Sequence, residues 1–525
     1  MNRVTAFLLA GVAAFGIAAA APADAKTIKW GGHRDIASLD PYSFGETTTL
    51  AFLNHVYEGL VRYDANFKLE PALATAWEVK GNIWRFTLRQ GVKFHNGNPF
   101  TADDVVASVK RATHDTSPLK GNLPAYKDVK KVDDYTVEIE VNGAYPLLLN
   151  DLTNIYIFDA EWLKANNSEL PTDAGKGVEG YATHNANGTG PFKVESRRPD
   201  AQTVMVANTA WWDKPKHNID RIEFIPITSA PTRVAALLSG EINFTNQAPL
   251  QDIGRLESAE NLKVLLANEL RTVFFAMNFG DKLVDSDVKD KNPLKDIKVR
   301  QALYQALDMN AMQKRAMRGL SRNTGALVAA AIPGYAPEQE PRLPYDPDAA
   351  KKLLAEAGYP NGFSFSFLCS TDSYVNEEEL CQAAAAMWTR VGLKPQITSG
   401  PRSLMNPKRV KGEFDITTLG WANEPMIDAY SILIQVVHTK SGAGGVFNWG
   451  GWGNAEIDKL TDDSAQELDP TKRIPMMQKA LKIAKDEIMF LPLHQQPMAW
   501  AASKDVTDIV QLSDNKPRLW LTRMK

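Results

Sequence analysis

Strand-like and helix-like segments alternate along this chain, and no Ser/Gly-rich or Pro-rich linker separates them. Residues 84–89 and 135–141 alternate apolar and polar side chains, which is typical of half-buried strands. Strands that alternate irregularly with helices predict an α/β fold, in which helices form layers on a sheet. Because no linker is present, we expect the domains to pack directly against one another.

Four helix starts are marked in the sequence. Thr101 and Asp104 are three residues apart and resemble a capping box. Asp-Pro pairs open two helices, at residues 346–358 and 469–488, by supplying an N-cap and a proline at the first helical position. The first of these should stop at the glycine that ends its range. An aspartate cap at the start of residues 296–319 predicts one long helix that ends near the glycine there.

Length and composition exclude several classes of protein. A chain of 525 residues suggests about three domains and can bury a large core. Its hydrophobic content of 44% excludes a disordered chain, and its 2 cysteines exclude a disulfide-built miniprotein. With 59 Lys+Arg against 62 Asp+Glu, the net charge is −3, so nothing indicates a nucleic-acid partner.

The N-terminus has the pattern of a secretory signal peptide. Arg3 supplies positive charge before an apolar run at residues 6–21, and small residues at 23–25 predict cleavage after Ala25. Residues 1–25 would be removed, which leaves a mature chain of 500 residues in an oxidising compartment outside the cytoplasm. A membrane anchor is the alternative, but the run is short and rich in Ala and Gly.

The two cysteines, Cys369 and Cys381, are predicted to form a disulfide in that compartment. Cys369 ends a strand-like run at residues 363–368, and Cys381 lies in the Ala-rich helix that follows. The bond would pin residues 370–380 across the strand-to-helix turn. Two separate buried thiols are the alternative that the sequence leaves open.

Strong catalytic motifs are absent from the sequence. We find no His-Glu-x-x-His, no Gly-x-Ser-x-Gly, no phosphate-binding Gly-x-x-x-x-Gly-Lys-Ser/Thr and no Gly-x-Gly-x-x-Gly after a strand. The 8 histidines show no i,i+4 ligand spacing. We therefore expect no catalytic residue, no cofactor and no metal site, and the chain is not predicted to be an enzyme.

Tryptophan gives a positive signal, because several of the 12 indoles stand beside glycine. Trp421 follows Gly420, and Trp449 and Trp452 flank a Gly-Gly pair. Indoles on Gly-rich turns offer broad apolar faces with one donor each, which suits a ligand cleft. Packing in a core or hinge is the alternative interpretation.

Several further strings occur in order along almost the whole mature chain. Together they resemble the extracytoplasmic solute-binding proteins of family 5, the peptide/nickel class of ABC importer receptors. The strings are Leu39-Asp40-Pro41, residues 56–63 (VYEGLVRY), 70–77 (EPALATAW), 88–97 (LRQGVKFHNG), 100–105 (FTADDV), 188–192 (GTGPF), 299–303 (VRQAL) and 345–354 (YDPDAAKKLL).

The resemblance implies a two-lobed periplasmic binding protein of type II, the Venus-flytrap kind. Lobe I would comprise residues 26–270, with an extra subdomain at about 70–190, and lobe II residues 271–490. Residues 491–525 would return to lobe I. The chain would cross twice, near 271–278 and 490–500, and the two crossings would act as a hinge that shuts the lobes on a ligand.

The resemblance also implies where the ligand lies. In this family the segment around Trp421 lines the cleft, and in peptide-binding members an acidic residue there pairs with the ligand's amino terminus. Glu424 and Asp428 are the acids available in this chain. The predicted ligand-binding residues are Trp421, Asn423, Glu424, Asp428, Tyr374, Asp372, Tyr42 and Trp449.

One feature departs from dipeptide binders, which carry an arginine for the peptide carboxylate in a loop of lobe II. The matching loop here, residues 370–377, has no arginine. A buried carboxylate needs a cation, so a zwitterionic peptide would require another partner, such as Arg402 or Arg34. A cationic or neutral polar solute would fit the acids of the cleft equally well.

The resemblance predicts the periplasmic substrate-binding component of an ABC importer, which captures a small peptide or similar polar solute. The expected partners are that ligand and the permease subunits in the inner membrane, and the expected state is a monomer. Alternatives are a receptor for an opine, a sugar conjugate, a cationic compound or a nickel chelate, the last through His438. A secreted hydrolase is a third interpretation, from another class.

Overall fold

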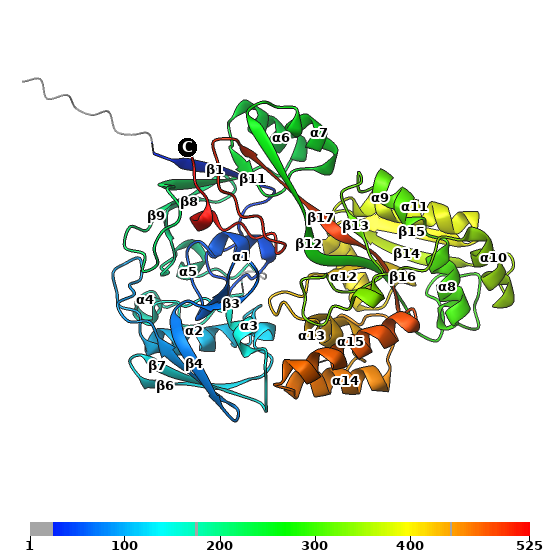
Figure 1. Cartoon of the computed structure of the whole chain (residues 1–525), viewed down its shortest axis with the longest axis horizontal. Helices are drawn as coiled ribbons and strands as arrows, with labels where there is room; N and C mark the ends of the chain where they lie inside the picture. Colours follow the sequence, from blue (N-terminus) through cyan, green and yellow to red (C-terminus); the bar gives the residue numbers. More distant parts are fainter. Residues whose placement is uncertain (1–24, 174–176, 442–443) are drawn as a thin grey trace, which may run out of the picture.

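The computed structural model describes residues 25–173, 177–441 and 444–525, so all but the last residue of the predicted signal peptide lies outside it. Figure 1 shows two bodies connected by two long neighbouring strands, β12 (Leu262–Met277) and β17 (Phe490–Ser503). Lobe I carries the elements up to α7 together with the C-terminal tail, and lobe II carries those from α8 to α15. The predicted two-lobed α/β fold is confirmed.

A large mixed sheet passes through both lobes in the order β15-β14-β16-β12-β17-β11-β1-β10-β9-β8, and β13 also pairs with β17. The strands β12 and β17 lie next to each other in this sheet and are antiparallel, with Leu262 opposite Ser503 and Ala276 opposite Phe490. Their register is interrupted between Asn268 and Thr272. The stretch that connects the lobes is therefore also the stretch where the central pairing is irregular.

Lobe I contains one end of the large sheet, a smaller sheet in the order β4-β5-β7-β6 and the pair β2-β3. Its strands are β1 (Thr27–Gly32), β2 (Val61–Tyr63), β3 (Leu69–Pro71), β4 (Ala74–Lys80), β5 (Ile83–Leu88), β6 (Tyr126–Asp133), β7 (Thr136–Val141), β8 (Phe192–Arg198), β9 (Gln202–Ala207), β10 (Arg221–Pro226) and β11 (Phe244–Thr245). Its helices are α1 (Thr47–Leu53), α2 (Ala102–Ala112), α3 (Leu148–Leu152), α4 (Ala160–Ala165), α5 (Tyr181–His184), α6 (Ala230–Ser239) and α7 (Ile253–Glu257).

Lobe II packs helices around the other end of the large sheet. Its strands are β13 (Arg322–Asn323), β14 (Ser364–Ser370), β15 (Lys394–Gly400) and β16 (Ile416–Trp421). Its helices are α8 (Ile297–Gln305), α9 (Met309–Arg315), α10 (Pro347–Glu356), α11 (Glu377–Arg390), α12 (Arg402–Val410), α13 (Tyr430–Ile432), α14 (Ala455–Gln466) and α15 (Pro470–Asp486).

The predicted helix starts are confirmed by their caps. At α2 the backbone N–H of Thr101 donates to Asp104 Oδ2 over 2.7 Å, as a capping box requires. Asp346 accepts from the Ala349 N–H at the start of α10, over 2.8 Å. Asp469 caps α15 in the same way, with a proline at the first helical position.

The prediction of one long helix over residues 296–319 is wrong. Asp296 does cap α8, but that helix ends at Gln305 and a second helix, α9, begins at Met309. Asp308 is the N-cap of α9, since its Oδ1 accepts from the Ala311 N–H over 2.9 Å. An aspartate side chain competes for backbone N–H groups and favours a new helix start over the interior of a helix.

The predicted disulfide is confirmed. Cys369 at the end of β14 and Cys381 in α11 are bonded, with their Cα atoms 6.6 Å apart. Both are fully buried in the core of lobe II. The bond ties α11 to the strand that precedes it, and it encloses the loop that carries Tyr374. Within the described part of the chain, no helix is long and apolar enough to cross a membrane.

Candidate ligand-binding site

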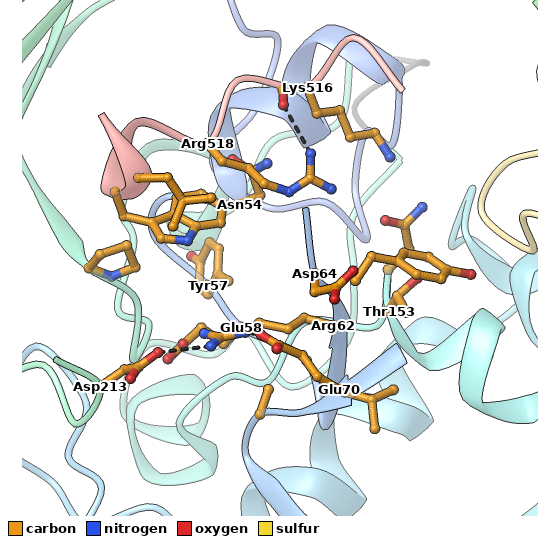
Figure 2. A pocket seen from close by; sticks show the side chains of 18 of the residues that line it. Asn54, Tyr57, Glu58, Arg62, Asp64, Glu70, Thr153, Asp213, Lys516 and Arg518 are labelled. Atoms are coloured by element: carbon orange, nitrogen blue, oxygen red, sulfur yellow. Dashed lines mark hydrogen bonds and ion pairs between the residues drawn. The ribbon is translucent and has the colours of Figure 1, made fainter. Parts of the chain in front are cut away.

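A pocket of about 170 Å³ lies where a loop of lobe II meets lobe I. Lobe I supplies most of its wall, from segments at 54–72, 153–156, 211–216 and 514–521, and lobe II supplies Glu424, Pro425 and Ile427. Figure 2 shows Lys516 and Arg518 facing Arg62 and Glu58 across this space. A ligand in the pocket would contact both lobes.

Four charged side chains gather on the lobe II side of the pocket. Lys516 Nζ lies 3.0 Å from Glu424 Oε2, and Arg518 binds Asp514 through contacts of 2.8 and 3.1 Å. Glu424 belongs to lobe II, and the other three belong to the C-terminal tail of lobe I. Paired charges beside a pocket can exchange partners with the ammonium and carboxylate groups of a ligand.

Burial shifts the pKa values of the pair that crosses between the lobes. Desolvation raises the pKa of Glu424, and the ammonium group of Lys516 opposes that rise. Desolvation also acts to lower the pKa of Lys516, but the carboxylates of Glu424 and Asp514 outweigh it, so this pKa is raised. Each charge is therefore held in place mainly by its partner.

The polar network continues from the pocket to the hinge strands. Glu269 on β12 accepts from Gln496 Nε2 over 2.9 Å and from Asn515 Nδ2 over 2.8 Å. Its neighbour Arg271 approaches Glu269 to 3.3 Å and lies 5.9 Å from the ring centroid of Tyr374. The hinge strands, the C-terminal tail and a lobe II loop are thus connected by side-chain contacts.

At the other end of the pocket, Arg62 on β2 holds two acids. Its Nε lies 2.7 Å from Glu70, and its Nη2 lies 2.8 Å from Asp213. Figure 2 shows Arg62 between these two acids. Both acids are therefore already paired within lobe I. The charges at this end are therefore paired within one lobe, whereas the pair of Glu424 and Lys516 joins the two lobes.

Glu58 also lines the pocket, and its carboxylate is held by uncharged donors. Trp212 Nε1 and Thr189 Oγ1 each donate to it over 2.8 Å, and Trp211 Nε1 donates over 3.2 Å. Burial raises the pKa of Glu58 from 4.5 to about 7, although these hydrogen bonds lower it. Glu58 joins β2 and its preceding turn to the segment that carries the two indoles.

Three of the predicted ligand-binding residues lie together in the lobe II strand and loop beside the pocket. Glu424 lines it directly. Trp421 is half-buried at the end of β16, and its Nε1 donates to Ser431 Oγ over 3.0 Å. Asn423 is 1% exposed and has a positive φ of 58°.

Two predicted acids are engaged elsewhere. Asp428 is 3% exposed and accepts from both terminal nitrogens of Arg473 on α15, over 2.7 and 2.8 Å. Asp372 is exposed and accepts from the backbone N–H of Arg402, at the start of α12. Neither is among the residues that line the pocket.

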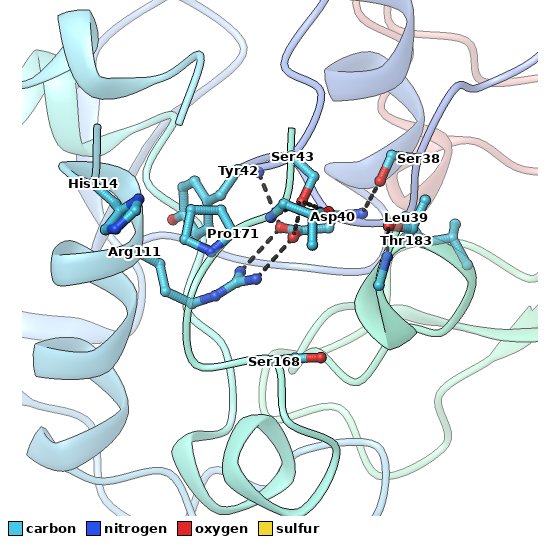
Figure 3. Close-up of polar contacts among 12 residues, drawn as sticks. Ser38, Leu39, Asp40, Tyr42, Ser43, Arg111, His114, Ser168, Pro171 and Thr183 are labelled. Carbon is cyan, nitrogen blue, oxygen red and sulfur yellow. Dashed lines mark hydrogen bonds and ion pairs between the residues drawn. The ribbon is translucent and has the colours of Figure 1, made fainter. Parts of the chain in front are cut away.

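Tyr42 lies in the core of lobe I. Its hydroxyl donates to the Tyr156 carbonyl over 2.6 Å, and its ring lies beside the guanidinium group of Arg111. Arg111 donates to both carboxylate oxygens of Asp40 over 2.8 and 3.0 Å. Figure 3 shows this pair. This buried pair joins the N-terminal segment to α2. Tyr42 packs beside the pair and therefore belongs to the core of lobe I.

The remaining predicted aromatic residues support the cleft-facing strand of lobe II. Tyr374 accepts from the backbone N–H of Gly420 over 2.7 Å. Trp449 is half-buried and packs on Phe447, which in turn meets the edge of Trp421. Both aromatic residues support the end of β16 that carries Trp421, and neither lines the pocket.

The cations of the pocket were not found from the sequence. Arg402 is placed on α12, and Arg34 pairs with Glu46 over 3.2 Å; neither lines the pocket, whereas Lys516 and Arg518 do. The charged residues at 514–518 could have indicated these cations, because they lie in the segment predicted to return to lobe I.

His438 is packed among its own neighbours. It is 6% exposed, and its Nδ1 lies 2.6 Å from the Thr439 carbonyl and 3.7 Å from Asp458 Oδ1. Among the residues that the structure describes, no group of three or more His, Cys, Asp or Glu side chains is arranged to hold a metal ion.

Two α/β lobes connected by paired strands, with a charged pocket at their junction, define a two-lobed solute-binding protein. A model of the bacterial extracellular solute-binding proteins, family 5, covering the middle of these proteins, matches residues 68–444. The chain belongs to this family.

Similar proteins extend the match to nearly the whole chain. The glutathione-binding protein GsiB of Shigella flexneri is 27% identical over 511 residues, which covers 95% of each chain. The structure of HbpA2 from Haemophilus parasuis, 25% identical, superposes with a TM-score of 0.80 over 95% of this chain and 99% of that one. The periplasmic binding protein DppA of Helicobacter pylori, in complex with the peptide STSA, is 23% identical and has a TM-score of 0.77 over 95% and 98%.

Proposed function

We propose that this protein is the periplasmic substrate-binding component of an ABC importer and that it captures a small peptide or similar polar solute. The family assignment supports solute binding. The relatives include a glutathione-binding protein and a periplasmic protein in complex with a peptide, which supports a peptide-like ligand. The protein would deliver its ligand unchanged to permease subunits in the inner membrane, and it would act as a monomer without enzymatic activity.

The observation that carries the proposal is the ion pair between Glu424 and Lys516. It joins the two lobes at the wall of the pocket, and its two charges match the ammonium and carboxylate ends of a peptide. Glu424 would take the ammonium group, and Lys516 with Arg518 would take a carboxylate. This arrangement supplies the cation that residues 370–377 lack.

We also propose the lobe boundaries at residues 26–270, 271–490 and 491–525, after a signal peptide at 1–25. The interrupted register between Asn268 and Thr272 supports a hinge beside the first boundary. Closure would change few backbone angles there, and a ligand that contacts both lobes would favour the shut state.

Titration calorimetry with trialanine and with glutathione tests the ligand class. The variant Glu424→Gln should weaken binding of trialanine, and N-acetylation of the peptide should weaken binding to the native protein to a similar degree. The acetylated peptide should bind both proteins equally, because its ammonium group is gone. Glu456→Gln is the matched control, since Glu456 is exposed on α14 and pairs with Lys479.

Failure of both peptides to bind the native protein would contradict the peptide assignment. Native mass spectrometry of protein purified from its own periplasm would then identify the co-purified solute. Recovery of the bound peptide in cleaved form would contradict the role of a receptor. A bound solute that left the radius of gyration unchanged in X-ray scattering would contradict lobe closure.

A further inference from the structure

The tip of the lobe II loop at residues 423–427 is held by two side chains of lobe I. Asn150 on α3 donates from Nδ2 to the carbonyl oxygen of Met426 over 2.7 Å. The hydroxyl of Tyr63, at the end of β2, lies 3.2 Å from the carbonyl oxygens of both Pro425 and Met426. Asn150 also donates to the Tyr63 hydroxyl over 2.9 Å, so the two side chains act together.

The loop has a backbone conformation that needs support. Asn423 and Ile427 have φ angles of 58° and 47°. The left-handed region is unfavourable for a β-branched side chain, so Ile427 is strained there. Its N–H donates to the Asn423 carbonyl over 2.7 Å, which closes the loop on itself. Such a conformation persists only where neighbouring groups hold it.

The two sides of the loop are supported by different lobes. Within lobe II, Asp428 follows the loop directly and is fixed by its two contacts with Arg473. From lobe I, Tyr63 and Asn150 hold the carbonyls one and two residues after Glu424. The carboxylate of Glu424 faces the pocket from the same tip, so its place depends on how the tip is held.

We propose that Tyr63 and Asn150 are positioning residues that clasp the loop at residues 423–427 to lobe I, fix Glu424 at the pocket and stabilise the shut arrangement of the lobes. The consequence for binding rests on the proposed function. The clasp binds backbone carbonyls and requires no particular side chain on the solute. It therefore contributes equally to the binding of every solute that the shut lobes enclose.

Hydrogen exchange of the protein without added solute tests the clasp itself. In Asn150→Leu and in Tyr63→Phe, the amide of Ile427 should exchange at least about threefold faster than in the native protein, since a lost hydrogen bond weakens the closed tip by about that factor or more. Asn166→Leu is the control, because Asn166 is also half-buried and donates to a carbonyl, that of Trp162, within lobe I over 2.8 Å. Exchange at Ile427 that matched the control would overturn the proposal.

Stopped-flow binding of trialanine and glutathione tests the consequence. Asn150→Leu should raise the dissociation rate constant of both peptides by about threefold to tenfold and leave their association rate constants unchanged. An effect on only one peptide would overturn the proposal, because it would mean that Asn150 contacts the solute. If neither peptide bound the native protein, the proposed function would fail, and the exchange experiment alone would still decide the clasp.

Discussion

The carboxylate of Glu424 and the ammonium group of Lys516 lie 3.0 Å apart, although they come from different lobes and are 92 residues apart in the sequence. Their side chains are only 17% and 10% exposed. Because so little of this ion pair is exposed, solvent cannot fully stabilise one charge when its partner is removed. Each charge therefore depends on the other.

Removal of one member of this pair should therefore destabilise the protein more than removal of both. Lys516→Met leaves Glu424 buried beside Asp514 and should lower the free energy of unfolding by roughly 3–5 kcal/mol. The double variant Glu424→Gln, Lys516→Met should recover part of that loss. Urea denaturation of the native protein, both single variants and the double variant gives the coupling energy, and strictly additive losses would contradict the prediction.

The pair between Asp428 and Arg473 should support the site without contacting the solute. Asp428→Asn breaks a buried two-point contact between the loop end and α15, so the free energy of unfolding should fall by roughly 3–5 kcal/mol. The exposed pair of Glu456 and Lys479 is the comparison, and Glu456→Gln should change stability by less than about 1 kcal/mol. Equal effects of the two substitutions would show that burial does not matter here.

Local sequence signals were sufficient for much of the fold. The caps Asp346 and Asp469 act on backbone within three residues, so the sequence alone identifies them. Asp308 gives the same kind of signal, and it marks the start of α9 inside the range where the apolar pattern alone predicts one helix. The disulfide can also be predicted from the sequence, since Cys369 and Cys381 are separated by one strand-to-helix turn.

The ligand-binding site is harder to predict from the sequence, because its contacts join segments that are far apart in the chain. The family resemblance indicates Glu424 through the segment around Trp421, but it does not indicate the partner Lys516, which lies in the C-terminal tail. Asp428 carries the same charge as Glu424 four residues away, yet it pairs with Arg473, 45 residues further on. Residue type and spacing do not distinguish the acid that faces a pocket from the acid that packs against a helix.

The disulfide should stabilise lobe II and the loop that carries Tyr374. Cys369→Ala with Cys381→Ala should lower the free energy of unfolding by about 2–4 kcal/mol, because the bond restricts the unfolded chain over a separation of 12 residues. Thermal unfolding with and without a reducing agent checks this. The reducing agent should lower the melting temperature of the native protein and leave that of the double variant unchanged.

Glu58 should make stability depend on pH. Burial raises its pKa from 4.5 to about 7, so between these values the folded protein binds a proton that the unfolded chain has released. Its contribution to stability is fully present below about pH 4.5 and is lost as the pH rises through about 7. Over that range the free energy of unfolding should fall by up to about 3 kcal/mol.

Glu58→Gln isolates this effect, because the amide does not titrate. Urea denaturation at several pH values between 4.5 and 8 should show a flatter profile for the variant than for the native protein. Asp104, whose pKa burial raises to about 6, remains in both proteins, so the difference between the profiles reports Glu58 alone. The amide can also accept fewer hydrogen bonds from Trp211, Trp212 and Thr189, which lowers stability at every pH. A constant offset with parallel profiles would therefore mean that folding does not raise the pKa of Glu58, because its hydrogen-bond donors compensate fully for burial.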